Sequence, residues 1–231
     1  MPALSGICAA LCALGLVSAT PPVARPAQTT IRVNINFDRS VTSFVWTAVR
    51  QEVDAIWSDL GVKLMWTETT TGAPSIVAAD AEAALQLRVI VVPKRRDGGR
   101  MPHQVLGRTM VDINGNVRGP IYLYLDPIEL VLRQRETSNS LLHDVEFARA
   151  VGRVLAHELG HVLLGSPSYH DPSGLMRLQF SADQLAKSDR RAVQLADGSA
   201  ERLRERLAAL AAFASDERLT PPYVIAGPVK K

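Results

Sequence analysis

The sequence predicts an α+β fold in which a sheet and several helices pack against one another in layers. Apolar and polar residues alternate over 31–37, which is typical of a half-buried strand. Apolar residues recur every three or four positions over 41–60 and 141–164, which predicts two amphipathic helices. Runs of strand length at 62–67 and 85–92 lie between them. This order of strand, helix, strands and helices requires a layered sandwich.

The first predicted helix places one apolar stripe against the core. Gly61 is its natural stop, because glycine accepts the left-handed conformation in which many helices end. The strand over 85–92 is closed by Pro93, which cannot donate a hydrogen bond to a sheet. The apolar stripe of the helix over 41–60 consists of Val41, Val45, Val49, Val53, Ile56 and Leu60.

The middle of the chain predicts a long surface loop and a pair of strands. The loop covers 94–107 and contains a glycine pair among charged residues. Strands are expected over 106–111 and 121–125, around the turn signal Asn114-Gly115.

The second half of the chain is mainly helical. Residues 138–140 (Ser-Asn-Ser) supply candidate N-caps for the helix over 141–164, and Gly165 can end it. Ser181 opens another helix, and a further helix is expected over 200–214. The long helix is the element on which the candidate chemistry lies.

The N-terminus predicts export. The apolar run over 7–16 is too short to span a bilayer, and the small residues Val17-Ser18-Ala19 follow it, as at a signal-peptidase site. No Lys or Arg precedes the run, so an uncleaved membrane anchor is the alternative. We therefore expect a secreted or periplasmic protein. Cleavage would remove Cys8 and Cys12, leaving no disulfide, thiolate nucleophile or cysteine metal site.

The expected organisation is one domain with short flanking segments. Residues 1–19 form the signal, 20–30 a Pro-rich linker and 31–196 the main folded domain. A C-terminal helix over 197–216 and a flexible tail over 217–231 complete the chain.

The composition is that of a folded globular protein, with 47% hydrophobic and 21% charged residues. The formal net charge of +3 is small, and its signs are mixed along the sequence. It gives no indication of nucleic-acid binding. We expect a monomer with no stable membrane association once the signal is removed.

One pentapeptide carries metal-site chemistry: His157-Glu158-Leu159-Gly160-His161. Histidines four residues apart on a helix project from the same face, so both can bind one Zn²⁺ ion. Glu158, next to the first of them, can accept a proton from a metal-activated water. The alternative is a helix that carries two unrelated histidines. Apolar residues on both sides of the pentapeptide indicate a core helix, which favours the metal site.

A third ligand follows on the return of the chain. Gly165 ends the helix, and His170 comes next, which makes three histidines and leaves one position for water. This is the ligand set of a catalytic zinc site and not of a structural one. Asp171 is a possible substitute for His170.

These residues together resemble the metzincin clan of zinc endopeptidases. The resemblance rests on the HExxH segment, a following glycine, a third histidine and Gly174-Leu175-Met176. It implies that His157, His161 and His170 bind zinc and that Glu158 is the general base. Met176 would be the methionine of the Met-turn, an apolar floor beneath the metal.

The resemblance also implies the architecture and the place of the substrate. Metzincins have a twisted mixed sheet of about five strands, a backing helix, an active-site helix, the Met-turn and C-terminal helices. An antiparallel strand at the sheet edge binds an extended peptide by strand addition. Residues 177–180 would shape the pocket beyond the cleaved bond. The candidate edge strand consists of Gly107, Arg108, Thr109, Met110 and Val111.

The spacing departs from the clan pattern. Leu164 and Pro167 stand where the pattern has glycine and the third ligand, so Gly165 and His170 come one and three residues late. The loop between the ligands is therefore longer than usual. No tyrosine follows Met176 where some members keep one, and Tyr169 is the candidate to replace it.

Other sites are less favoured by the sequence. A gluzincin would need a downstream glutamate ligand, but Glu201 and Glu205 lie in a simple amphipathic helix. The spacing Asp112-x-Asn114-x-Asn116 resembles a calcium loop, although a hairpin turn explains it better. His103 and His143 are expected at the surface, away from any metal.

The sequence thus predicts a zinc-dependent endopeptidase that hydrolyses protein or peptide substrates. The alternative is a secreted zinc-binding or interaction module that has the same fold and no turnover. Glu158 argues against the module, since a purely structural site needs no base beside its ligand.

Overall fold

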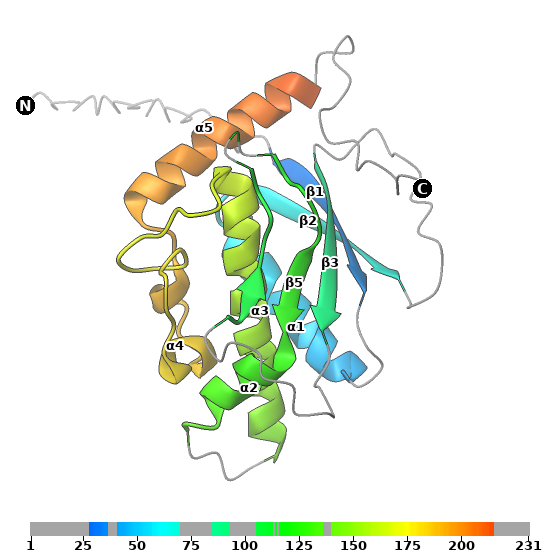
Figure 1. Ribbon diagram of the computed structural model, residues 1–231, viewed down its shortest axis with the longest axis vertical. Coiled ribbons are helices and arrows are strands. Elements are labelled where there is room, and N and C mark those ends of the chain that lie inside the picture. The colour runs from blue at the N-terminus through cyan, green and yellow to red at the C-terminus, as the bar shows by residue number, and fades with distance from the viewer. Residues whose placement is uncertain are drawn as a thin grey trace, which may run out of the picture.

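The computed structural model contains a mixed five-stranded sheet, the central layer of an α+β fold (Figure 1). The strand order is β2-β1-β3-β5-β4; the first four strands are parallel to their neighbours and β4 is antiparallel at the edge. The strands are β1 (Thr29–Asn36), β2 (Val62–Thr69), β3 (Leu85–Val92), β4 (Gly107–Arg108) and β5 (Ile121–Tyr124). The structure describes residues 28–36, 41–69, 85–92, 105–112, 114, 116–135 and 140–214.

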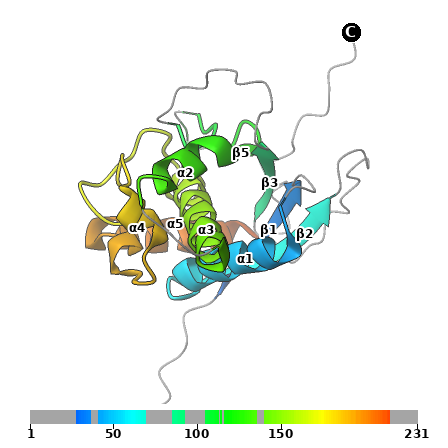
Figure 2. The ribbon, with the colours of Figure 1, turned by 90° about the horizontal axis from the view of Figure 1, so that it is seen from below.

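Two long helices, α1 (Ser43–Ser58) and α3 (Ser140–Leu164), cover one face of the sheet (Figure 2). They pack tightly, since a Cβ atom added at Gly152 of α3 would lie 2.9 Å from the Cβ of Glu52 on α1. The strand residues beneath them are buried; they include Ile31, Val33, Ile35, Leu87 and Val89. Strand β1 was expected to be half-buried, but Arg32 and Asn34 on its other face are buried as well, with 7% and 6% of their surface exposed.

Buried charges join α1 to α3. Arg153 has no exposed surface, and its Nε donates to Glu52 at 2.9 Å. Its other nitrogens donate to the backbone carbonyls of Gln184 and Asp189. Arg190 donates to the second oxygen of Glu52 at 2.8 Å, so every charge in the group has a partner. This group fixes the middle of α3, one turn before the HExxH segment.

The predicted helix boundaries at Gly61 and Ser181 are found in the structure, while α1 begins at an N-cap that was not predicted and the candidate caps at 138–139 lie outside the described residues. The hydroxyl of Thr42 accepts from the N–H of Val45 at the start of α1, and Gly61 has a φ of +78° after its end. Helix α4 (Ala182–Ala186) begins with a capping box between Ser181 and Gln184. The 3-10 turn Arg191–Val193 and α5 (Asp197–Ala214) follow.

The structure corrects the prediction around β5 in one respect. A strand was expected as far as residue 125, but Leu125 already begins α2 (Leu125–Leu132). The signal was present in the sequence: Pro127 suits a first helical turn, and Leu125, Ile128 and Leu132 recur at helical spacing and are buried.

The predicted strand over 106–111 is also shorter than expected. Gly107 and Arg108 pair with β5, and the pairing then ends. Beyond it there is only a single bridge between Val111 and Val117. Pro120 lies on the partner segment between these pairings and has no N–H to donate, which interrupts the ladder. The antiparallel pair itself is as predicted.

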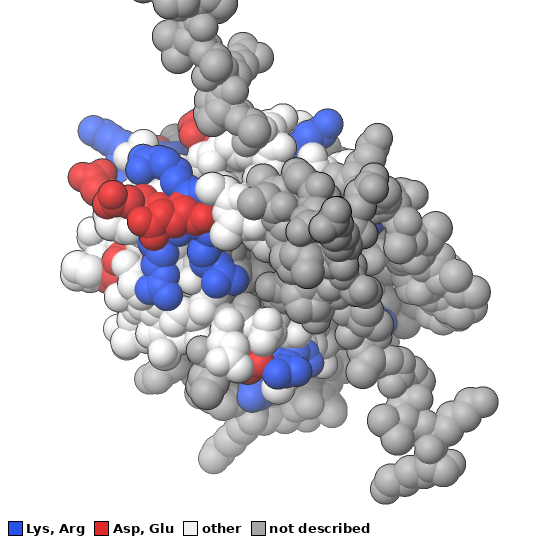
Figure 3. Space-filling view, turned by 90° about the horizontal axis from the view of Figure 1, so that it is seen from above, with Lys and Arg blue, Asp and Glu red and all other residues white. Residues whose placement is uncertain are grey.

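Helix α5 crosses the end of the sheet and of α3 (Figure 1). Seen from that side, acidic and basic side chains lie next to one another, in agreement with the low net charge (Figure 3). None of the described helices is long and apolar enough to cross a membrane. The predicted signal over 1–19 and tail over 217–231 lie outside the described residues.

Candidate metal centre

Helix α3 brings the HExxH segment into the core. His157, Glu158 and His161 keep 8%, 5% and 6% of their surface exposed. The helix then ends in a Schellman motif, in which Ser166 donates its N–H to His161 O and Gly165 to Val162 O, both at 3.1 Å. Gly165 has a φ of +63°, so the chain reverses directly after the histidine pair.

Backbone carbonyls fix the protonation of both rings. His157 Nδ1 lies 2.8 Å from Leu175 O, and His161 Nδ1 lies 3.1 Å from Ser166 O. A carbonyl can only accept, so each Nδ1 carries the proton and each Nε2 is left with a lone pair. The two Nε2 atoms face one another at 3.1 Å. Two lone pairs at this distance repel unless they share a cation, and the donor set therefore fits a metal ion.

Burial keeps these rings neutral. It lowers the pKa of His157 to about 4, and it also lowers the pKa of His161 below its usual value. Both imidazoles are therefore uncharged near pH 7, which is the form that binds a metal.

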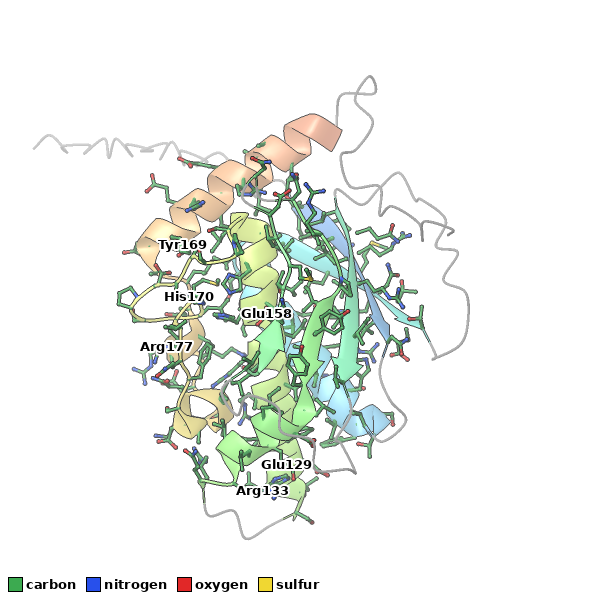
Figure 4. The ribbon with its side chains drawn as sticks, viewed as in Figure 1. Glu129, Arg133, Glu158, Tyr169, His170 and Arg177 are labelled. Atoms are coloured by element: carbon green, nitrogen blue, oxygen red, sulfur yellow. The ribbon has the colours of Figure 1, made fainter. Side chains whose placement is uncertain are left out.

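His170 completes the group from the return loop between α3 and α4. One ring nitrogen from each of the three histidines lies within 4.8 Å of the other two. The His170 ring centroid is 5.0 Å from that of His161, and Figure 4 shows the side chain beside α3 near Glu158. Within the described part of the chain, no other cluster of His, Cys, Asp or Glu has the geometry to hold a metal.

Asp171 and Tyr169 lie elsewhere than the sequence suggested. The Asp171 carboxylate accepts from the hydroxyl of Tyr169 at 3.0 Å and from the hydroxyl of Ser199 on α5. Asp171 therefore faces α5 and is not part of the histidine group. The expectation for Tyr169 was wrong: its hydroxyl is engaged by Asp171, and it does not line the cleft at the histidines.

Met176 packs against α3 at Gly160. It is fully buried, and a Cβ added at Gly160 would come within 2.3 Å of its sulfur. Only glycine at position 160 leaves room for this thioether next to His161. The Met176 carbonyl accepts from the N–H of Asp171 at 2.8 Å, which joins the turn to the His170 loop.

Glu158 sits in a notch of the edge strand. The hydroxyl of Thr109 lies 2.6 Å from its Oε2, and a Cβ added at Gly107 would lie 2.7 Å from its Oε1. Burial raises the pKa of Glu158 to about 7, and the hydrogen bond from Thr109 opposes that rise. Thr109 and Gly107 belonged to the predicted edge strand, but their contact with Glu158 could not be read from the sequence.

A cleft of about 480 Å³ opens over the three histidines and Glu158. Gly107, Arg108 and Thr109 of the predicted edge strand line it, while Met110 and Val111 do not. Of the predicted pocket residues 177–180, Leu178, Gln179 and Phe180 line the cleft. Arg177 turns back instead: its Nε donates to Gly174 O at 3.1 Å. Five lining residues were not expected from the sequence: Val105, Leu106, Val131 of α2, Val154 of α3 and Pro167.

The alternative sites receive no support. The Asp112 carboxylate accepts from the N–H groups of Asn114 and Asn116 and from Arg118, as in a hydrogen-bonded turn. The backbone hydrogen bond from Asn116 contributes most to lowering the pKa of Asp112, to about 2. Glu201 and Glu205 are exposed on α5. His143 stacks on Phe147, and His103 lies outside the described residues.

Comparisons with known proteins give structural likeness only. No family model matches the sequence, and no curated protein matches it. The fold is similar to an archaemetzincin from Methanopyrus kandleri, with 15% identity, a TM-score of 0.48, and coverage of 80% of this chain and 99% of that one. It is also similar to metalloproteinase-II from Bacteroides fragilis, with 14% identity and a TM-score of 0.46. That match covers 78% of this chain and 54%, about half, of the other.

Proposed function

We propose that this protein is a metzincin-like, zinc-dependent endopeptidase. His157, His161 and His170 would hold the metal, with Met176 as the apolar floor of a Met-turn. The observation that carries the proposal is the pair of Nε2 lone pairs facing one another at 3.1 Å, with a buried carboxylate in the same cleft. A hydrolytic metal site needs ligands for the metal and a base close to the metal-bound water, and these residues could supply both.

Glu158, Thr109 and Gly107 each have a separate role in the proposed reaction. A bound zinc ion would supply Lewis acidity and lower the pKa of a water molecule. Glu158 accepts the proton of the attacking water and passes it to the leaving amine, which requires a pKa near the working pH. Thr109 holds one carboxylate oxygen by its hydroxyl and so restricts rotation of the base. Gly107 lets the strand approach the carboxylate without a clash.

The proposed substrate is an extended protein or peptide segment. Strand β4 is the antiparallel edge of the sheet and also lines the cleft. An edge strand offers free backbone donors and acceptors, with which a peptide can pair as an added strand. This would lay the scissile bond over the histidine group. We also propose export of the protein, on the strength of the apolar run and small residues before position 20.

The second candidate, a zinc-binding module without turnover, would be favoured by a protein side chain that fills the fourth metal position. Asp171, the neighbour of His170, does not do so, because its carboxylate accepts from Ser199 and Tyr169. The endopeptidase is therefore the better supported function.

The test compares the protein with its Glu158→Gln variant for zinc content and for proteolysis of casein. We expect one zinc per chain in both, and a loss of activity of about 10²–10⁴-fold in the variant, the usual contribution of a general base. Glu205→Gln, on the exposed face of α5, is the matched control and should keep full activity. Zinc in both proteins with turnover in neither would favour the binding module.

A further inference from the structure

The loop that carries His170 is fastened to α5 at two points. At its start, a Cβ added at Gly165 would lie 2.3 Å from Arg206 Cζ, so the guanidinium of α5 lies against the glycine. Farther along the loop, Asp171 meets Ser199 in the first turn of α5. Helix α5 itself is held in the core by Leu203 and Leu207.

The contacts around His170 are the most specific of these. Tyr169 and Asp171 are its two chain neighbours, and the Tyr169 hydroxyl donates to Asp171 Oδ1 at 3.0 Å. The Ser199 hydroxyl donates to Asp171 Oδ2 and lies 3.2 Å from the Tyr169 hydroxyl. Ser199 has no exposed surface, so its hydroxyl has a fixed place in the protein. Arg202, also on α5, lies 5.0 Å from the centre of the Tyr169 ring.

The opposite side of the same segment is fixed by the backbone. Asp171 donates its N–H to Met176 O, and the following turn is held by Leu175, which donates to Gln194 O at 2.9 Å. Both neighbours of His170 are thereby restrained. The position of the His170 imidazole can therefore change little except by rotation about its own side-chain bonds. By contrast, none of these contacts comes from the helix that carries His157 and His161.

The geometry points to Asp171 and Ser199 as positioning residues that set the place of the His170 imidazole, which makes α5 part of the metal centre. This inference rests on the zinc site of the proposed function. The return loop is longer than the metzincin pattern, and a longer loop loses more conformational entropy when its end is fixed. Contacts that order the loop before the metal arrives reduce that cost. Outer residues that orient a ligand typically change metal affinity by about 10–100-fold.

The experiment measures zinc affinity by competition with a chelator, together with the visible absorption of the cobalt-substituted protein. We expect Asp171→Ala and Ser199→Ala to weaken zinc binding, the former by about 10–100-fold. The cobalt spectrum should change as well, because its intensity reports the coordination number. Asp171→Asn should stay close to the parent, since its amide can accept from Tyr169 and donate to Ser199.

Two comparisons make the result decisive. Ser181→Ala removes another serine hydroxyl, the cap of α4, and should lower stability without changing zinc affinity. If Asp171→Asn loses as much zinc affinity as Asp171→Ala, the charge of the Asp171 carboxylate matters and its hydrogen bonds do not. The inference is then overturned. Unchanged affinity and spectrum in both alanine variants would overturn it as well. Absence of peptidase activity in a parent that binds zinc would defeat only the proposed function, while a parent without zinc binding would defeat both.

Discussion

The three histidines of the metal centre come from two regions that are held in different ways. His157 and His161 lie on a buried helix, whose middle is fixed by the ion pair of Arg153 and Glu52. His170 lies on a half-buried loop, whose neighbours bind α5 through Ser199. The helix pair therefore depends on the core, and the third ligand depends on contacts made at the surface of another helix. Disturbing the contacts with α5 should therefore affect His170 more than the helix pair.

The helix region should show the largest effect on stability. Glu52→Ala leaves Arg153 buried without its carboxylate, and removal of one partner from a buried pair costs about 3–5 kcal/mol in unfolding free energy. Denaturant unfolding of the metal-free protein measures the loss. Glu68→Ala is the control, because its pair with Arg50 is partly exposed and should contribute about 0.2–1 kcal/mol. Equal losses would contradict the view that the buried pair fixes α3.

Substitution of the histidines themselves separates the two regions further. His161→Ala and His170→Ala should each weaken zinc binding by about 100-fold or more, beyond the usual effect of residues outside the ligand set. The stability of the metal-free protein should separate them. His161→Ala leaves the Ser166 carbonyl without its donor and should cost about 1–3 kcal/mol. His170→Ala should stay within about 0.5 kcal/mol of the parent. Thermal unfolding of both without metal checks this difference.

The contact between the helix and the Met176 turn can be tested by overpacking. Gly160→Ala places a methyl group against the Met176 sulfur and should cost about 1–3 kcal/mol. Gly198→Ala on α5 is the matched control, since nothing lies within 4 Å of the added Cβ. It should be neutral or slightly stabilising. A tolerated Gly160→Ala would show that Met176 does not need this glycine.

The edge strand should show the smallest effect. Thr109→Val keeps the shape of the side chain and removes the hydroxyl that binds Glu158. A hydrogen bond to a charged group contributes about 1.5 kcal/mol at the low end, so we expect kcat to fall about tenfold with KM unchanged. Thr109→Ser should restore most of it. A rise in KM alone would instead place Thr109 in substrate binding.

The sequence predicted what local rules determine. Helical spacing gave the His157 and His161 pair, and the glycines gave the ends of α1 and α3. It could not show that Thr109 would reach Glu158, since they meet only through tertiary packing. The partner of Asp171 was also hidden, because Ser199 lies 28 residues away. The early end of strand pairing at β4 was readable from Pro120, which lies between the two predicted strands, although 106–111 was predicted to pair over its whole length.

We propose that one metal ion is bound by three histidines from both regions. X-ray absorption of the zinc-loaded protein, with His170→Ala as reference, counts the imidazole ligands directly. We expect three imidazoles and an oxygen atom in the protein, at about 2.0–2.1 Å for nitrogen, and two imidazoles in the variant. Two imidazoles in both proteins would contradict it, because the loop and its contacts with α5 would then have no part in the site.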